Sequence, residues 1–528
     1  MTTLSAAAQV SPPAVAPRMP RQIPFIIGNE ACERFSFYGM RNILTPFLVG
    51  WLLLNVPEGT ERDGAAKEVF HAFVMGVYFF PLLGGWLADR FLGKYRTIFW
   101  LSLVYCAGHA CLAFSETYKP GFYTGLFLIA LGSGGIKPCV SAYMGDQFDQ
   151  SNKSLARLAY DAFYWIINFG SFFASLLMPI ALISFGPSVA FGIPGILMFV
   201  ATVIFWAGRG RYVNVPPSPK DPHSLTQVAR TALLADPDGK GRPGLVLASA
   251  GAVLAVASLA LTPVIGLVAA LCLALVVALA SAGLGVLWQL DRARGTHPDA
   301  DVDGVRAVLK VLVIFALITP FWSLFDQKAS TWVLQSRSMP LPGWSWFKSG
   351  AQMQSLNPLL VMILVPFNNL VLYPALRRVG VEPTPLRRMA SGIAFSGLSW
   401  IAIGVIQLTI DGGTKVSVLW QALPYLLLTF GELLVSATGL EFAYSQAPAK
   451  LKGVLMSFFQ LSTTVGSLWV LLVNAGVKNP SVVSSIASTG IGVTAFQMFF
   501  FATFAFAAAL AFAAYARRYR MADHYRAA

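Results

Sequence analysis

Long apolar segments alternate with short polar connections along almost the whole chain. Most of these segments contain about twenty residues or more, which is the length that a helix needs to cross the hydrocarbon core of a bilayer. The pattern therefore predicts an all-α integral membrane protein. Fourteen transmembrane helices are expected, near residues 24–54, 66–88, 97–115, 121–145, 158–183, 188–208, 243–262, 265–289, 304–335, 349–376, 389–409, 417–446, 453–476 and 487–516.

The seventh and eighth predicted helices differ from the others. Residues 243–289 consist of Ala, Val, Leu and Gly with almost no polar residue, and they reverse at an uncharged turn at Thr262-Pro263. Such a segment cannot bind a polar solute, so we expect a lipid-facing hairpin inserted between two six-helix halves. The predicted organisation is a disordered cytoplasmic tail at 1–20, a six-helix bundle at 21–212, a linker with the hairpin at 213–302, a second six-helix bundle at 303–517 and a cytoplasmic tail at 518–528.

Composition and charge support this interpretation. Hydrophobic residues make up 56% of the 528 residues and charged residues only 12%, whereas a soluble domain carries about 25% charge. The net charge of +14 would suit a nucleic-acid partner, but most of the 38 Lys and Arg residues lie in connections on one side of the predicted membrane. This bias places both termini in the cytoplasm. We expect membrane lipid and no nucleic acid as a partner.

The five cysteines lie within apolar segments and lack the spacing of metal ligands. They are interpreted as packing residues without disulfides. Neither a metal nor a cofactor is expected.

The first predicted helix carries several ionisable residues. Glu30, Glu33, Arg34, Tyr38 and Arg41 follow steps of three and four residues, so a helix places them on one face. Ionisable groups at membrane depth are costly and usually line a solute pathway or a proton relay. This charged face is the main indication of function.

Two polar segments at the predicted cytoplasmic side are candidates for charge-paired latches. The connection after the second helix, Gly85-Trp86-Leu87-Ala88-Asp89-Arg90-Phe91-Leu92-Gly93-Lys94, resembles a loop of the major facilitator superfamily. Asp146, Asp149 and Lys153 follow the fourth helix, and they suit either a gate or a solvated loop. Twelve bundle helices with the first loop imply a transporter, whose solute the site has to identify.

The segment Glu30-Ala31-Cys32-Glu33-Arg34-Phe35 resembles the Glu-x-x-Glu-Arg-Phe motif of proton-dependent oligopeptide transporters. Further segments that resemble this family are 134–139, 163–171, 321–327, 357–358, 431–436 and 439–448. The inserted hairpin is similar to the extra helix pair of bacterial members. The resemblance implies a major facilitator fold and a secondary active transporter of the bacterial inner membrane, not an enzyme. It would work as a monomer and import di- and tripeptides together with protons by alternating access.

The residue types suit a short peptide, which is a zwitterion. Its carboxylate needs cations, and its ammonium needs a carboxylate and amide oxygens. The resemblance assigns Arg41 and Lys137 to the peptide carboxylate. It assigns Asn168, Asn357 and Glu432 to the amine end. Tyr38, Tyr78 and Ser436 would offer hydroxyl contacts, and Trp322 with Phe459 would form an aromatic wall. The family motif has Tyr where this chain has Phe37, which puts one hydroxyl contact in doubt.

Proton coupling needs carboxylates whose protonation changes as the site opens and closes. Glu30 and Glu33 beside Arg34 fit this requirement, because the Arg keeps one carboxylate ionised while burial favours a proton on the other.

Two further groups are candidates for the same task. Asp326 would pair with Lys137 or Arg41 when the outer gate is closed, and its protonation would release that pair. His71 resembles the histidine of animal-type members, and histidine titrates near physiological pH.

Other functions fit the sequence less well. A proton/drug antiporter would keep a large apolar cavity with few charges, and members that carry nitrate tend to lose the Glu-x-x-Glu-Arg pattern. A membrane enzyme is disfavoured because the chain has no His-Glu-x-x-His and no Gly-x-Ser-x-Gly. A channel is disfavoured because an occluded bipolar site binds too specifically for fast flow. A family member that carries nitrate or a drug-like compound remains the alternative.

Overall fold

The computed structural model describes residues 18–149, 152, 155–217, 221–236, 239, 241–446 and 451–519. The predicted tails fall largely outside this part of the chain, as does Lys153. Within the described residues the regular secondary structure is helical, apart from one isolated bridge between Arg294 and His297. The prediction of an all-α protein is confirmed.

Six long helices form the N-terminal group. α1 lies between α5 and α6, α4 lies between α2 and α3, and their buried side chains share one apolar core. π-helical turns at Leu48–Leu52 and Ala88–Leu92 extend α1 and α2. The six helices are α1 (Ile23–Phe47), α2 (Thr60–Leu87), α3 (Lys94–Phe114), α4 (Lys119–Gly145), α5 (Ala156–Phe185) and α6 (Pro187–Ala207).

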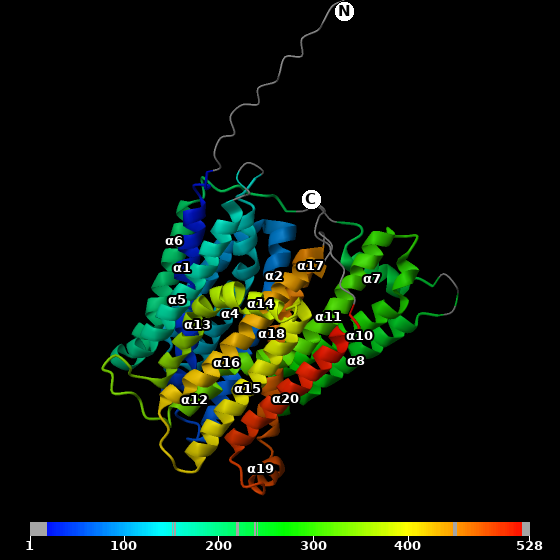
Figure 1. Ribbon diagram of the computed structural model, residues 1–528. Helices are drawn as coiled ribbons and strands as arrows, with labels where there is room; N and C mark the ends of the chain where they lie inside the picture. The colour runs from blue at the N-terminus through cyan, green and yellow to red at the C-terminus, as the bar shows by residue number, and fades with distance from the viewer. Residues whose placement is uncertain are drawn as a thin grey trace, which may run out of the picture.

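The C-terminal group has a second apolar core, in which α15 packs against α16 and α20, and α11 packs against α18. Several of its membrane-length segments are interrupted, so it contains more and shorter helices (Figure 1). They are α11 (Asp299–Asp326), α12 (Thr331–Ser336), α13 (Leu356–Phe367), α14 (Tyr373–Arg378), α15 (Pro385–Asp411), α16 (Ala422–Glu432), α17 (Thr438–Gln446), α18 (Lys452–Gly476), α19 (Pro480–Ala487) and α20 (Val493–Ala516).

Thirteen helical segments among the described residues are long and apolar enough to cross a membrane. The segment of α1 is not one of the thirteen. It carries Glu30, Glu33, Arg34 and Arg41, and these charges lower its hydropathy. Although α1 packs as a full-length member of the N-terminal group, the count of fourteen spans stays a prediction.

The structure corrects three details of the predicted segments. The span predicted at 304–335 is broken after Asp326 by a 3₁₀ turn at Gln327–Ala329. The last span begins at Val493 rather than at residue 487, because a loop separates α19 from α20. The predicted linker contains an additional helix, α7 (Leu225–Leu234), which packs on α10 and α11.

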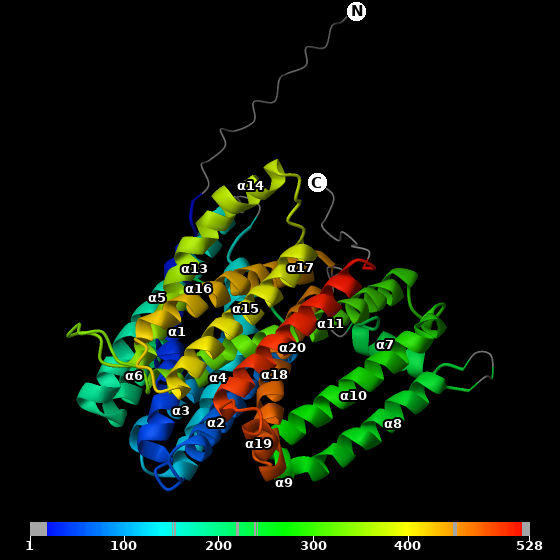
Figure 2. The ribbon, with the colours of Figure 1, turned by 60° about the horizontal axis from the view of Figure 1, so that its bottom comes forward.

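The inserted hairpin consists of α8 (Pro243–Ser258), α9 (Thr262–Ile265) and α10 (Leu267–Gln289). Figure 2 shows α8 and α10 side by side at the edge of the molecule. The chain reverses at Gly266, whose φ is +84°, and not at the predicted Thr262-Pro263 turn, because Thr262 and Pro263 begin α9. The outer surface of α8 exposes apolar side chains such as Val253 and Val256, as expected for contact with lipid.

The crossing of α2 and α4 offers a test of the packing. A methyl group on Gly84 would lie 2.3 Å from Cα of Gly135, whereas a methyl group on Gly85 would meet open space. We therefore expect Gly84→Ala to destabilise the fold by about 1–3 kcal/mol and to lower the midpoint of thermal unfolding in detergent. Gly85→Ala is the matched control. Equal midpoints for the two variants would contradict the close approach of these helices.

Candidate functional site

The two helix groups are joined on the side of the molecule that lies opposite the start of α1, which we call the far side. There the guanidinium of Arg41 on α1 donates to Asp326 on α11 over 2.6 Å. The Thr45 hydroxyl donates to the carbonyl oxygen of Ala329 over 2.7 Å. These contacts connect the N-terminal group to the break between α11 and α12.

The helices α2 and α18 form a second connection on the far side. The Thr464 hydroxyl donates to the carbonyl of Met75 over 3.3 Å, and Asn474 donates to the carbonyl of Gly64 over 3.1 Å. Lys478 is paired with Glu68 at 2.5 Å. These contacts hold the two groups together on the far side.

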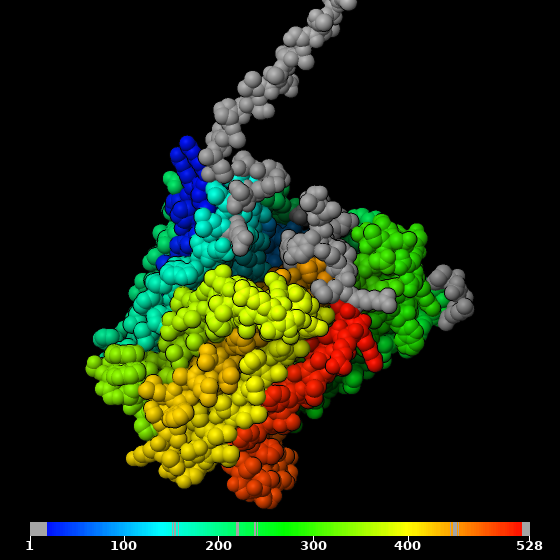
Figure 3. Space-filling view, viewed as in Figure 1, coloured from blue at the N-terminus to red at the C-terminus, as the bar shows by residue number. Residues whose placement is uncertain are grey.

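The side on which α1 begins, which we call the termini side, is different. Figure 3 shows a recess that opens there between the cyan N-terminal helices and the orange C-terminal helices. Two ion pairs at this side lie within the groups: Lys94 with Asp146 at 2.6 Å, and Arg388 with Glu441 at 3.2 Å. The first of these links the predicted latch segments, the loop at 85–94 and the end of α4.

The carboxylates and the first arginine of the charged face of α1 are buried. The exposed fractions of Glu30 and Glu33 are 4% and 1%. Arg34 Nε lies 2.9 Å from Glu30 Oε1 and 2.5 Å from Glu33 Oε2. Within the described part of the chain neither oxygen of Glu33 accepts a hydrogen bond. Glu33 is therefore held by its ion pair with Arg34.

Lys137 lies between two aromatic rings. Its Nζ is 4.4 Å from the ring centroids of both Phe37 and Tyr78, a distance at which a cation is attracted to a π face. Phe37, the residue that departs from the family motif, thus supports a cation by its ring. Of the two cations predicted as partners of Asp326, the structure pairs Asp326 with Arg41.

The predicted amine end is built from α13 and α16. Asn357 Nδ2 donates to Glu432 Oε2 over 2.6 Å and to the Thr429 hydroxyl over 3.0 Å. Asn357 Oδ1 accepts a hydrogen bond from Lys328 Nζ over 2.8 Å. This brings together two of the three groups that were predicted to bind an ammonium.

Lys328 is the residue of the site that the sequence analysis missed. Its Nζ lies 3.2 Å from the centroid of the Phe325 ring, and the side chain is buried. A signal was present, because a lysine inside an apolar span is a functional candidate by default.

The remaining predicted contacts are less closely connected. Trp322 packs edge-to-face on Phe459 with 6.0 Å between the ring centroids, so the expected aromatic wall exists. Asn168 donates to the carbonyl of Tyr164 on its own helix, although α5 packs against α13. Ser436 is half-buried in the π-helical turn Leu433–Ala437 that follows Glu432. Tyr38, also half-buried, packs edge-to-face on the Phe37 ring.

His71 lies apart from the α1 carboxylates, at the contact between the two groups. It is fully buried on α2. Its Nε2 is 3.0 Å from the Ser330 hydroxyl and its Nδ1 is 3.5 Å from the Ser467 hydroxyl. Because both serines belong to the C-terminal group, separation of the groups on the far side would break both contacts.

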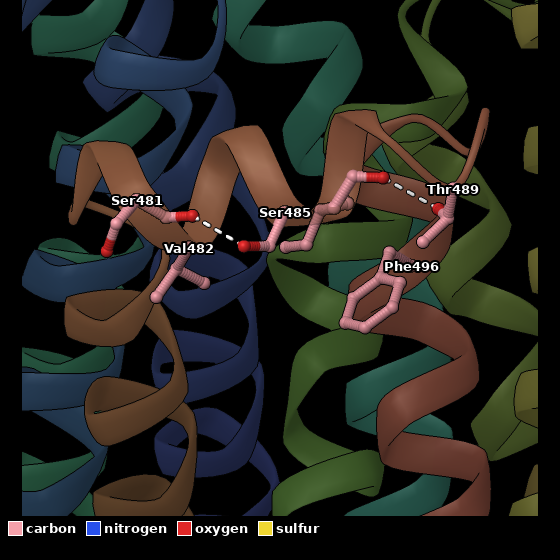
Figure 4. Close-up of a pocket in the computed structure, with 6 residues that line it drawn as sticks. Ser481, Val482, Ser485, Thr489 and Phe496 are labelled. Atoms are coloured by element: carbon pink, nitrogen blue, oxygen red, sulfur yellow. Dashed lines mark hydrogen bonds between the residues drawn. The ribbon is translucent and has the colours of Figure 1, made fainter.

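A small surface pocket between α19 and α20 is unrelated to this site. It is lined by residues that include Val482 and Phe496 (Figure 4). The Ser485 and Thr489 hydroxyls donate to carbonyls of α19 itself, over 2.9 and 2.6 Å. These two hydroxyls thus already have partners, and no charged residue lines the pocket.

Two groups of membrane-length helices with a bipolar charged site between them define a transporter of the major facilitator type. The family model described as PTR2, POT family, matches residues 95–491, and the chain belongs to this family.

Curated relatives support this family assignment. "Peptide transporter 3" of Caenorhabditis elegans is 34% identical over 406 residues, which cover 74% of this chain and 51% of the relative. Human "Solute carrier family 15 member 2" is 32% identical over 416 residues, which cover 76% and 51%. The chain thus spans about half the length of these curated relatives.

Two solved structures cover the chain almost completely. The crystal structure of an auto-inhibited POT family peptide transporter has a TM-score of 0.94 and 67% identity, and the match covers 96% of this chain and 99% of that one. The POT family transporter PepTSo has a TM-score of 0.93 and 66% identity, with 96% and 100% covered.

Proposed function

We propose that the protein is a proton-coupled symporter that imports di- and tripeptides by alternating access. One observation carries this proposal: the site has cations on the N-terminal group, Arg41 and Lys137, and an anion on the C-terminal group, Glu432. A short peptide has the complementary charges at its two ends. A zwitterion that bridges the groups would also couple its own binding to their closure.

The proposed contacts follow this polarity. Arg41 and Lys137 would bind the peptide carboxylate. Asn168, Asn357 and Glu432 would bind the amine end. Tyr38, Tyr78 and Ser436 would supply hydroxyl contacts, and Trp322 would form the aromatic wall. The Caenorhabditis elegans relative is named a peptide transporter, and the auto-inhibited solved structure is described as one, which supports this choice of solute.

The cycle requires the far side to open. We infer that Arg41–Asp326 and the His71 contacts separate in that step, and that protonation of Asp326 or His71 promotes it. Glu30 and Glu33 would exchange the proton beside Arg34 on the termini side. With cytoplasmic termini, the contacts that join the groups on the far side and the recess on the termini side would correspond to a state open to the cytoplasm.

The proposed setting is the inner membrane of a bacterium. Both termini would be cytoplasmic, and one chain would be sufficient for transport. The proposed bundles are residues 21–212 and 303–517, with the linker and hairpin at 213–302 between them.

The decisive experiment measures uptake of a labelled dipeptide into liposomes that contain the purified protein, with and without an inward proton gradient. We expect accumulation that an uncoupler abolishes and that excess tripeptide, but not free amino acid, inhibits. The absence of uptake by folded protein would overturn peptide as the solute, and nitrate and drug-like compounds would then be tested in the same liposomes.

A further inference from the structure

Lys328 holds a position in the site that the proposed function leaves unused. The chain leaves α11 at Asp326 and makes a 3₁₀ turn at Gln327–Ala329 before α12 begins. This turn places the Lys328 ammonium on Asn357 Oδ1, over 2.8 Å, and on the face of the Phe325 ring. Asn357 in turn donates to Glu432 over 2.6 Å. An ammonium group, an amide oxygen and a carboxylate thus form one chain of contacts.

A peptide N-terminus would need the same partners. It is an ammonium group that donates up to three hydrogen bonds, and at the amine end it would meet an amide oxygen that Lys328 already engages. We propose that Lys328 is a specificity-determining residue, an internal ligand whose ammonium occupies the amine subsite of the peptide-free protein and is displaced by the N-terminus of the substrate. This inference rests on the proposed function. It states that the amine end of the peptide competes with Lys328 for its subsite.

Displaced Lys328 has a second partner within the site. Asp326, two residues earlier, is 1% exposed, and its Oδ2 makes no hydrogen bond with the described residues. Lys328 is close enough to interact with the charges of both Asp326 and Glu432. Released from Asn357, Lys328 would compete with Arg41 for Asp326. Arrival of the peptide amine would thereby weaken the ion pair that joins α1 to α11 on the far side.

The test compares Lys328→Met, which keeps an unbranched side chain of similar size and removes its charge, with the unaltered protein. Binding of three probes is measured on purified full-length protein: dialanine, N-acetyl-dialanine and dialanine amide. If Lys328 fills the subsite in about nine of ten molecules, the apparent affinity for a free amine is about tenfold below its intrinsic value. We therefore expect Lys328→Met to bind dialanine and dialanine amide about tenfold more tightly. Binding of N-acetyl-dialanine, which has no ammonium, should not improve.

The possible outcomes separate the roles of Lys328. Weaker binding of dialanine with unchanged binding of dialanine amide would make Lys328 a ligand of the peptide carboxylate and would overturn the proposal. An equal change for all three probes, or no change, would mean a purely structural role and would also overturn it. If neither protein binds any of the probes, the proposed function itself fails.

Two further variants secure the comparison. Lys310→Met makes the same chemical change at an exposed position of α11 and should leave all three affinities unchanged. If Lys328→Met does not fold, Lys328→Gln removes the charge with a shorter polar side chain, and the same pattern across the three probes is expected.

Discussion

Glu33→Gln is expected to abolish proton-driven accumulation of peptide while exchange of peptide between two loaded compartments continues. The Glu33 carboxylate is almost completely buried and lies 2.5 Å from Arg34. Glutamine has nearly the same shape but can neither take up nor release a proton. The variant would therefore lose the step that links the proton gradient to the return of the empty carrier. Exchange needs only movement of the loaded carrier and does not require that step.

Two liposome assays measure this difference. The first follows uptake of labelled dipeptide under an inward proton gradient, and the second follows counterflow with unlabelled dipeptide inside. Glu61→Gln makes the same change at an exposed residue of α2 and should behave as the unaltered protein in both. If Glu33→Gln still accumulates dipeptide against its gradient, the assignment of proton coupling to this residue is wrong.

Glu432→Gln is expected to weaken binding of dialanine by about 10- to 100-fold, since a hydrogen bond to a charged group contributes about 1.5–3 kcal/mol. Glu432 accepts the hydrogen bond from Asn357 and supplies the negative charge of the C-terminal half of the site. Glutamine can keep a hydrogen bond to Asn357, but it removes the charge that would attract the peptide ammonium. Titration of the purified variant with dialanine measures the loss.

The same titration with N-acetyl-dialanine tests the assignment of the peptide end. This ligand has no ammonium, so the substitution should affect it far less. Glu441→Gln is a suitable control, because Glu441 is exposed and paired with Arg388 on the termini side. Equal loss for dialanine and N-acetyl-dialanine would show that Glu432 does not meet the amine end.

Local periodicity made the charged face of α1 predictable. Steps of three and four residues put Glu30, Glu33 and Arg34 together on any helix, and the structure holds them within 3 Å of one another through Arg34. The membrane-length helices were predictable for a related reason. A bilayer offers the backbone no hydrogen-bond partner, so a span is formed mainly by apolar helix of sufficient length.

Breaks inside such spans were harder to predict. The turn at Gln327–Ala329 and the reversal at Gly266 lie within or beside long apolar segments, where composition hardly changes. The contacts of Lys328 could not be predicted as a consequence, because they depend on this turn. The helix α7 was missed because it is short and is stabilised by packing on its neighbours, which gives a weak signal in the sequence.

The sequence by itself determined the membrane setting, the helical class, the charged face of α1 and the family, since each depends on local patterns of residues. The tertiary structure alone decided that Asp326 pairs with Arg41 rather than with Lys137, and that Asn357 joins Lys328 to Glu432. Arg41 and Asp326 are 285 positions apart in the chain. Whether such groups meet depends on how two helix groups pack against each other, and that packing is the sum of many apolar contacts which no local pattern specifies.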